Sequence, residues 1–238
     1  MILDLFRTSN PTDLILTLFT RLFTCALILP LHEFAHAWSA YKLGDDTAQR
    51  QGRMTINPIA HIDPMGMLCM LVVGLGWAKP VPVNPYRFDK KHTIRGGSAL
   101  TSAAGPLSNF IAAFVMMIVF QIFTCLESTQ TQWAEYAMTG EINAAYVTFY
   151  IMQLFIQINI HLALFNLLPI PPLDGSAIFA FFFGNKFIGF MNRNQQIISV
   201  IFMITILSGV LRVPLGFVGD IIYTVFRLAT SWIPMILG

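Results

Sequence analysis

The sequence has little charge for its length. Only 11% of its 238 residues are Asp, Glu, Lys or Arg, and 55% are hydrophobic. A soluble domain usually has about 25% charged residues, so this composition excludes an ordinary soluble domain and favours a polytopic membrane protein. The formal net charge of +2 is too small to indicate nucleic-acid binding, and we expect no nucleic-acid partner.

Cysteine is also scarce. Cys25, Cys69 and Cys125 lie in or beside apolar runs and show no CxxC spacing. The pattern therefore favours small core or lipid-facing residues over a disulfide framework or a cysteine metal site. A small-residue cleavage site is missing after the first apolar run, which follows Arg7, so this run is interpreted as a retained span rather than a signal peptide.

Long apolar runs take up most of the chain instead. Since a helix needs about 20 residues to cross a bilayer, five runs are predicted to span it: residues 13–43, 98–124, 144–168, 197–211 and 215–237. The run at 65–78 has only 14 residues and is predicted to be re-entrant. Residues 47–63 alternate apolar and polar side chains around prolines, which predicts short strands and turns. We expect an all-α polytopic membrane protein of about five to six transmembrane helices, with a short re-entrant or β-hairpin region between the first two long spans.

The basic side chains indicate an orientation. Residues 42–97 carry eight Lys or Arg against four Asp or Glu, whereas the loop at 125–143 carries three Glu and no basic residue. Cytoplasmic loops have the Lys and Arg excess. Residues 44–97 and 184–196 are therefore predicted to be cytoplasmic, so the sequence HEFAH at 32–36 lies near the cytoplasmic end of the first helix.

HEFAH places ionisable side chains inside a predicted span, where each costs about 2.5 to 3.5 kcal/mol. Residues i and i+4 share a helix face, so His32 and His36 can bind one metal ion while Glu33 reaches a bound water. This is the H-E-x-x-H arrangement of zinc hydrolases, in which the glutamate is the general base. The alternative is that both histidines only hydrogen-bond to neighbouring helices, which the intramembrane position disfavours.

Catalytic zinc usually takes three protein ligands, which calls for one more. Asp174 follows Pro169, Pro171 and Pro172, which prevent regular helix at the end of a span. Non-helical backbone at membrane depth is tolerated only against protein or a water-filled cavity. Asp174 is therefore the candidate third ligand, and the alternative is that it merely caps a helix beginning at Gly175.

Five motifs occur in one order along the chain: HEFAH, GRMTINPIAHIDPMG, GWAKPVPVNP, AGPLSN and FNLLPIPPLDG. Together they resemble the site-2 protease family of intramembrane zinc metalloproteases, in particular its compact bacterial and archaeal members without PDZ or CBS domains. The resemblance covers about residues 22–176. It implies one Zn²⁺ per chain bound by His32, His36 and Asp174, with Glu33 as the catalytic base.

The resemblance also implies the reaction, the setting and the organisation. The reaction is hydrolysis of peptide bonds within or near transmembrane segments of other membrane proteins, with the active site near the cytoplasmic side of a bacterial or archaeal cell membrane. Residues 1–238 form a single domain, with a three-span catalytic core at about 13–176 and C-terminal spans at about 177–238. The oligomeric state is not predicted.

Further residues have more than one interpretation. Asn166 matches a family asparagine that helps to bind substrate or the developing oxyanion, and the alternative is an interhelical hydrogen bond. Gly105 and Asn109 fit a small-residue face where helices approach closely. His61 is interpreted as closing a turn rather than approaching the site. The segment GWAKPVPVN is predicted to be an edge strand that holds an unwound substrate.

Two other classes of protein compete with a protease. One is a membrane scaffold with a vestigial zinc site, but such a protein need not keep both Glu33 and Asp174. The other is a metal transporter, which needs polar side chains along a path across the whole bilayer, whereas here they cluster at one depth.

Overall fold

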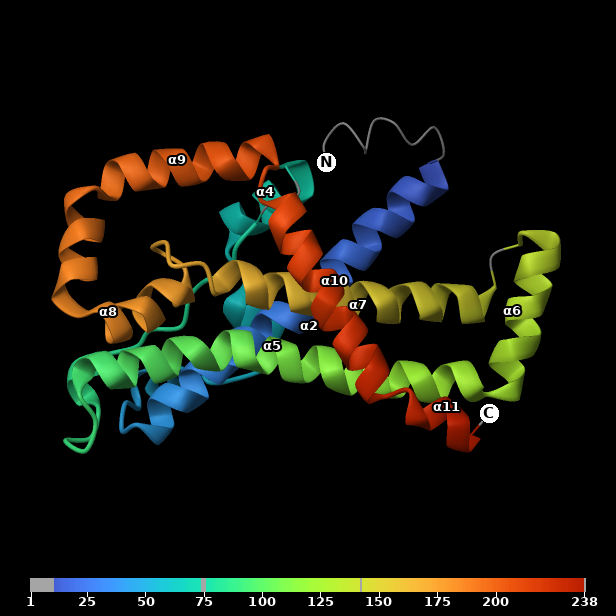
Figure 1. Cartoon of the computed structure of the whole chain (residues 1–238), viewed down its shortest axis with the longest axis horizontal. Helices are drawn as coiled ribbons and strands as arrows, with labels where there is room; N and C mark the ends of the chain where they lie inside the picture. Colours follow the sequence, from blue (N-terminus) through green and yellow to red (C-terminus); the bar gives the residue numbers. More distant parts are fainter. Residues whose placement is uncertain (1–10, 74–75, 142, 238) are drawn as a thin grey trace. The chain divides into compact units, whose positions relative to one another are not determined.

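The computed structural model describes residues 11–73, 76–141 and 143–237, so the prediction at Arg7 lies outside the described residues. The chain divides into two compact units. The first consists of Met1–Ser108 with Pro169–Arg193, and the second of Asn109–Leu168 with Asn194–Gly238. Helix α5 (Ile94–Cys125) contributes residues to both units (Figure 1).

The first unit is built around the C-terminal half of a long first helix, α2. Its elements, besides the first part of α5, are α2 (Pro11–Lys42), α3 (Thr47–Arg50), η1 (Pro58–His61), α4 (Pro64–Val73), η2 (Pro85–Arg87) and α8 (Asp174–Arg193). Both 3₁₀ turns start in the same way. The side chains of Asn57 and Asn84 accept hydrogen bonds from the amides two residues on, and a proline occupies the next position. These caps are the local sequence signal for the two turns.

The end of α2 is packed against the loop that precedes α5. Gly44 adopts a φ of 102°, which favours glycine. The buried Asp45 side chain accepts hydrogen bonds from the amide nitrogens of Thr47 (3.0 Å) and Asn84 (2.6 Å). Val81 packs with Ala37 in a small apolar core. These contacts hold the 79–89 loop against the helix that carries HEFAH.

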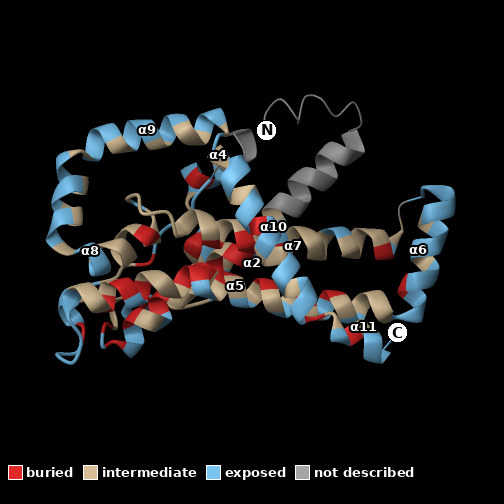
Figure 2. Cartoon of the chain, in the orientation of Figure 1, coloured by how far each residue is buried: buried red, intermediate tan, exposed pale blue. Residues whose placement is uncertain are grey.

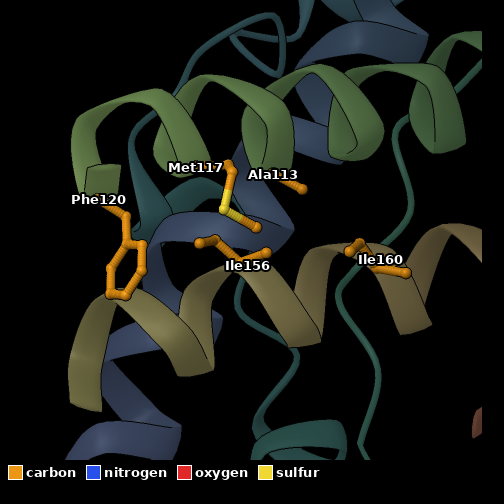
Figure 3. Close-up of a cluster of buried hydrophobic side chains, with 5 residues drawn as sticks. All are labelled: Ala113, Met117, Phe120, Ile156 and Ile160. Carbon is orange, nitrogen blue, oxygen red and sulfur yellow. The ribbon is translucent and has the colours of Figure 1, made fainter. Parts of the chain in front are cut away.

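The second unit consists of the rest of α5 with α6 (Glu127–Thr139), α7 (Ala144–Asn166), α9 (Gln195–Ser208), α10 (Arg212–Ala229) and α11 (Trp232–Leu237). Figure 3 shows the centre of its core, where side chains of α5 meet side chains of α7: Ala113, Met117, Phe120, Ile156 and Ile160. Helix α10 packs on α7 as well, because Gly219 lies against His161 and the Tyr223 hydroxyl donates to Gln153 Oε1 at 2.9 Å.

A buried amide pair joins α5 to α7. Asn109 Nδ2 donates to Asn159 Oδ1 at 2.8 Å, and both side chains have no exposed area. Because an unpaired amide is costly in an apolar environment, this bond fixes the register of the two helices. It agrees with the structural role expected of Asn109.

Three described helical stretches are long and apolar enough to cross a membrane: Ile94–Cys125, Ala144–Asn166 and Arg212–Leu237. Few of their residues are fully buried, as Figure 2 shows for α10, and most of the large exposed side chains are apolar, as expected for contact with lipid. The structure therefore supports an all-helical membrane protein with three of the five predicted spans. Helix α9 has only 14 residues, about 21 Å at 1.5 Å per residue, which is short of the hydrocarbon thickness.

The predicted β-hairpin is not confirmed, because the described part of the chain contains no strand. Residues 47–63 fold instead as α3, an irregular loop and η1. Alternation of apolar and polar residues predicts a strand only where a neighbouring backbone pairs with it. In this region the Asn57 side chain and Pro58 direct the chain into a 3₁₀ turn.

Candidate metal centre

His32 and His36 lie one turn apart on α2, as their spacing predicts. Their Nε2 atoms are 3.0 Å apart, and the rings meet edge to face with centroids 4.6 Å apart. Both side chains are buried, with relative exposures of 5% and 8%. The helix thus directs two imidazole nitrogens to one point in the first unit.

Asp174 completes the group. It is the first residue of α8, directly after the irregular segment 167–173 that contains three prolines. Its Oδ2 atom is 3.3 Å from His32 Nε2 and 3.4 Å from His36 Nε2. One ligand atom from each of the three residues lies within 4.8 Å of the other two. The proline-rich break therefore returns the chain to the histidines at the position where sequence reasoning placed the third ligand.

A backbone carbonyl sets the proton on His36. The Nδ1 atom lies 2.7 Å from the carbonyl oxygen of Thr101 on α5. A carbonyl oxygen only accepts hydrogen bonds, so Nδ1 carries the proton and donates it. In the neutral ring, the lone pair is then on Nε2, which faces His32 and Asp174. Metal-binding histidines are usually oriented in this way.

The donor set fits zinc. Asp174 Oδ2 is buried and makes no well-formed hydrogen bond among the described residues, although the two histidine Nε2 atoms lie 3.3 and 3.4 Å away. A buried carboxylate oxygen without a partner is costly, and a cation between it and two imidazole nitrogens removes that cost. Two histidines and one carboxylate form a ligand set of catalytic zinc and leave a fourth position open for water.

Gly105 of α5 leaves room for the histidine pair. A Cβ atom at this position would overlap His36 Nε2 and lie 2.6 Å from His32 Cε1. Sequence reasoning expected Gly105 to permit close approach of helices, and the structure specifies that the approaching groups are the two imidazoles. Any side chain at position 105 must displace them.

We expect Gly105→Ala to lower zinc affinity by about 10- to 100-fold, the range found when groups that orient metal ligands are changed. Zinc retained by the purified variant after dialysis against a chelator series measures this. Ser102→Ala, on the same helix, is the control and should bind zinc as the wild type does. Equal retention by all three proteins would show that the imidazoles can shift without loss.

Glu33 is attached to the 79–84 segment. Its Oε2 atom accepts a hydrogen bond from the backbone N–H of Val81 at 2.8 Å. Residues 79–84 belong to no helix or strand. Sequence reasoning singled out both Glu33 and this segment but did not connect them, because a backbone amide has no signature in the sequence.

The two other candidates have local partners. Asn166 is the last residue of α7, in the second unit, and its Nδ2 donates to the Leu162 carbonyl at 3.0 Å, within its own helix. His61 is 2% exposed, its Nε2 donates to the Thr55 carbonyl at 2.8 Å, and its own carbonyl accepts from Lys79 N–H at 2.9 Å. These bonds favour a turn-closing role for His61. A contact of Asn166 with substrate stays a prediction.

Comparison with known proteins gives one family and a few relatives. The profile of Peptidase family M50 matches residues 21–210. YwhC of Bacillus subtilis, a proposed zinc metalloprotease by its name, is 45% identical over 157 residues, which are 65% of this chain and 65% of YwhC. Rip2 of Mycolicibacterium smegmatis, named in the same way, is 30% identical over 149 residues, 62% of this chain and 51% of Rip2. The chain thus matches between half and two thirds of the length of these relatives. No solved structure is a significant match.

Proposed function

The chain belongs to peptidase family M50, and from this premise we propose that it is an intramembrane zinc metalloprotease. The convergence of His32, His36 and Asp174 on one buried point, with Glu33 beside them, carries the proposal. A chain with three helical stretches long and apolar enough to cross a membrane suits substrates that are themselves membrane segments. The proposed reaction is hydrolysis of a peptide bond within or near a transmembrane helix of another protein.

Each residue of the site has a part in the proposed hydrolysis. His32, His36 and Asp174 hold one zinc ion per chain, and the Thr101 carbonyl keeps His36 in the tautomer that binds. Bound zinc polarises the substrate carbonyl and lowers the pKa of water to about 7. Glu33 would take a proton from the attacking water as the C–O bond forms, and would then pass it to the leaving amine nitrogen as the C–N bond breaks.

The substrate helix must unwind at the cleaved bond, and the 79–84 segment is the proposed support for the unwound part. Pro80 and Pro82 have no N–H to donate, so the odd-numbered residues supply the amides of one edge. Lys79 N–H bonds to the His61 carbonyl and Val81 N–H to Glu33, so Val83 N–H is the amide proposed to pair with the substrate. Addition of a substrate strand to that edge places its backbone beside Glu33, which the Val81 amide contacts. Asn166 is proposed to help bind the substrate or the developing oxyanion.

Val83→Pro tests this support. The change removes one amide from the edge, so we expect cleavage of a transmembrane substrate to fall by about 10-fold, close to the loss of one hydrogen bond. Zinc content is measured in parallel and should not change, since Val83 is not one of the proposed ligands. Lys90→Pro, in the exposed loop after the segment, is the control. A proline at Tyr86 would be less suitable, because Tyr86 N–H donates a hydrogen bond to Asn84. Undiminished cleavage by Val83→Pro would exclude strand addition at this edge.

The setting of the enzyme is part of the proposal. We place it as a multi-pass protein in a bacterial or archaeal cell membrane with the zinc site near the cytoplasmic side. The excess of Lys and Arg between residues 42 and 97 supports this orientation.

Hydrolysis in a defined membrane tests the proposed function. The purified protein is reconstituted in lipid vesicles with single-span peptides that contain helix-breaking residues, and the products are identified by mass spectrometry. Zinc-dependent cleavage within the span is expected, with Glu33→Gln as the control. Absence of cleavage from every peptide by zinc-loaded protein would contradict a protease.

A further inference from the structure

The 79–84 segment has few backbone hydrogen bonds to hold it in place. Its two prolines cannot donate, and no strand pairs with it among the described residues. Backbone outside regular secondary structure with so few hydrogen bonds ordinarily moves. Nevertheless the Val81 N–H meets one carboxylate oxygen of Glu33 at 2.8 Å, so something outside the segment must fix its position.

Arg53 fixes the segment on the N-terminal side of Val81. Its Nη2 atom donates to two successive carbonyl oxygens, of Lys79 at 2.6 Å and of Pro80 at 3.1 Å. A guanidinium group is planar and carries several donors in a fixed geometry, so one side chain restrains two peptide groups at once. These are the two peptide groups directly before Val81.

Asp45 fixes the segment on the C-terminal side. Its Oδ2 atom accepts a hydrogen bond from Asn84 N–H at 2.6 Å, and its other oxygen accepts from Thr47 N–H at 3.0 Å. The carboxylate is completely buried, so both bonds are shielded from water. Bonds between a charged group and backbone amides are about twice as strong as neutral ones. Asp45 therefore ties the segment to the end of α2, the helix that carries Glu33.

We propose that Arg53 and Asp45 are positioning residues for the general base. They clamp the 79–84 segment at both ends, so that the Val81 N–H holds Glu33 Oε2 and leaves Oε1 to take the proton from the attacking water. The proposal rests on the proposed function, since it takes Glu33 as the base. It adds two residues, neither of which lies in the H-E-x-x-H motif or touches the metal ligands.

The chain offers a matched control for each anchor. Arg50 lies three residues before Arg53, but its side chain is exposed and pairs with Asp46 at 2.6 Å. Asp46 follows Asp45 directly, yet its contacts are with the side chains of Arg50 and Arg87 rather than with the segment. Arg50→Ala and Asp46→Ala thus remove the same charges from nearly the same place, and the ion pairs that they break are with each other and with Arg87, beyond the end of the segment.

Hydrogen exchange tests the clamp independently of activity. Amide exchange in residues 79–84 of the zinc-loaded protein is expected to quicken by about 10-fold or more in Arg53→Ala and Asp45→Ala, because local opening becomes easier. Arg50→Ala and Asp46→Ala should exchange at the wild-type rate. Arg53→Lys, which keeps a donor but not the planar group, should lie between. Unchanged exchange in both anchor variants would overturn the proposal.

A double-mutant cycle tests the effect on catalysis. With zinc content unchanged, Arg53→Ala should lower kcat by about 10- to 100-fold, as misplacement of a catalytic group by about 1 Å does. In the Glu33→Asp variant the shorter side chain already displaces the carboxylate. There, Arg53→Ala should lower kcat by less than about 3-fold, because both changes act on one interaction. If the loss of kcat in the double variant equals the product of the losses in the two single variants, Arg53 does not act through Glu33.

The two failures are distinguishable. If the wild-type protein cleaves no substrate while exchange quickens only in the anchor variants, the proposed function fails and the clamp on Glu33 stands. If the wild type cleaves normally and the anchor variants cleave and exchange as it does, the proposed function stands and the positioning role is wrong.

Discussion

Glu33→Gln is expected to abolish peptide hydrolysis while the protein keeps its zinc. The amide has nearly the size of the carboxylate and can still accept the Val81 N–H bond, so the local structure should persist. It cannot take up a proton at neutral pH, and a general base contributes about 10²- to 10⁴-fold to a rate. We therefore expect a loss of at least about 10²-fold in kcat with an unchanged KM.

The measurement is cleavage of a transmembrane peptide in vesicles, with the zinc content of the same preparation determined in parallel. Glu127→Gln, on the exposed α6, controls for the loss of one negative charge and should cleave at the wild-type rate. Cleavage by Glu33→Gln within a few-fold of the wild type would show that another group accepts the proton.

His36→Ala and Asp174→Ala are expected to lose zinc and, with it, all activity. Each change removes one of three protein ligands. Replacing a group that only orients a ligand already costs about 10- to 100-fold in affinity, so the loss of a ligand itself should exceed that range. Metal content after purification and dialysis should fall from one zinc per chain to nearly none.

The controls separate metal loss from unfolding. His92→Ala, in the exposed basic loop, should keep its zinc, and so should Glu33→Gln. Asp174→Glu keeps a carboxylate, and it should retain more zinc than Asp174→Ala does. Full zinc occupancy in Asp174→Ala would mean that the third ligand is a different residue.

The part of the site that follows from side-chain spacing could be predicted from the sequence. His36 is four positions after His32, and helix geometry alone then places them on one face. Asp174 could be predicted as their neighbour because three prolines before it break the helix at the depth of HEFAH. The structure brings these three side chains together, and metal binding by them stays a prediction.

The backbone groups of the site could not be predicted. The Thr101 carbonyl orients His36, and the Val81 amide holds Glu33. Nearly every residue has a backbone carbonyl and a backbone N–H, so no side-chain pattern identifies these two. Their positions depend on how α5 and the 79–84 segment pack against α2. The role of Gly105 could be predicted in part. The sequence indicates a close approach of helices at this residue, but it does not indicate that the two imidazoles are the groups that approach.

The fold shows the same division. Hydrophobicity over more than 20 residues predicts α5 and α7 as spans, and the match to the family profile agrees with the resemblance read from the five motifs. The short elements between α2 and α5 were harder to predict. There the alternation of apolar and polar residues predicts strands, whereas the asparagine caps and the prolines that follow them favour 3₁₀ turns.

Zinc-edge X-ray absorption on the purified wild-type protein tests whether His32, His36 and Asp174 bind one zinc ion. We expect one zinc per chain with two imidazole nitrogens at about 2.0–2.1 Å, and with oxygen from a carboxylate and a water completing a four-coordinate shell. The Asp174→Glu variant should keep the two imidazoles and change only the oxygen contribution. A protein that binds no zinc, or a shell without two imidazoles, would contradict the site built from His32, His36 and Asp174.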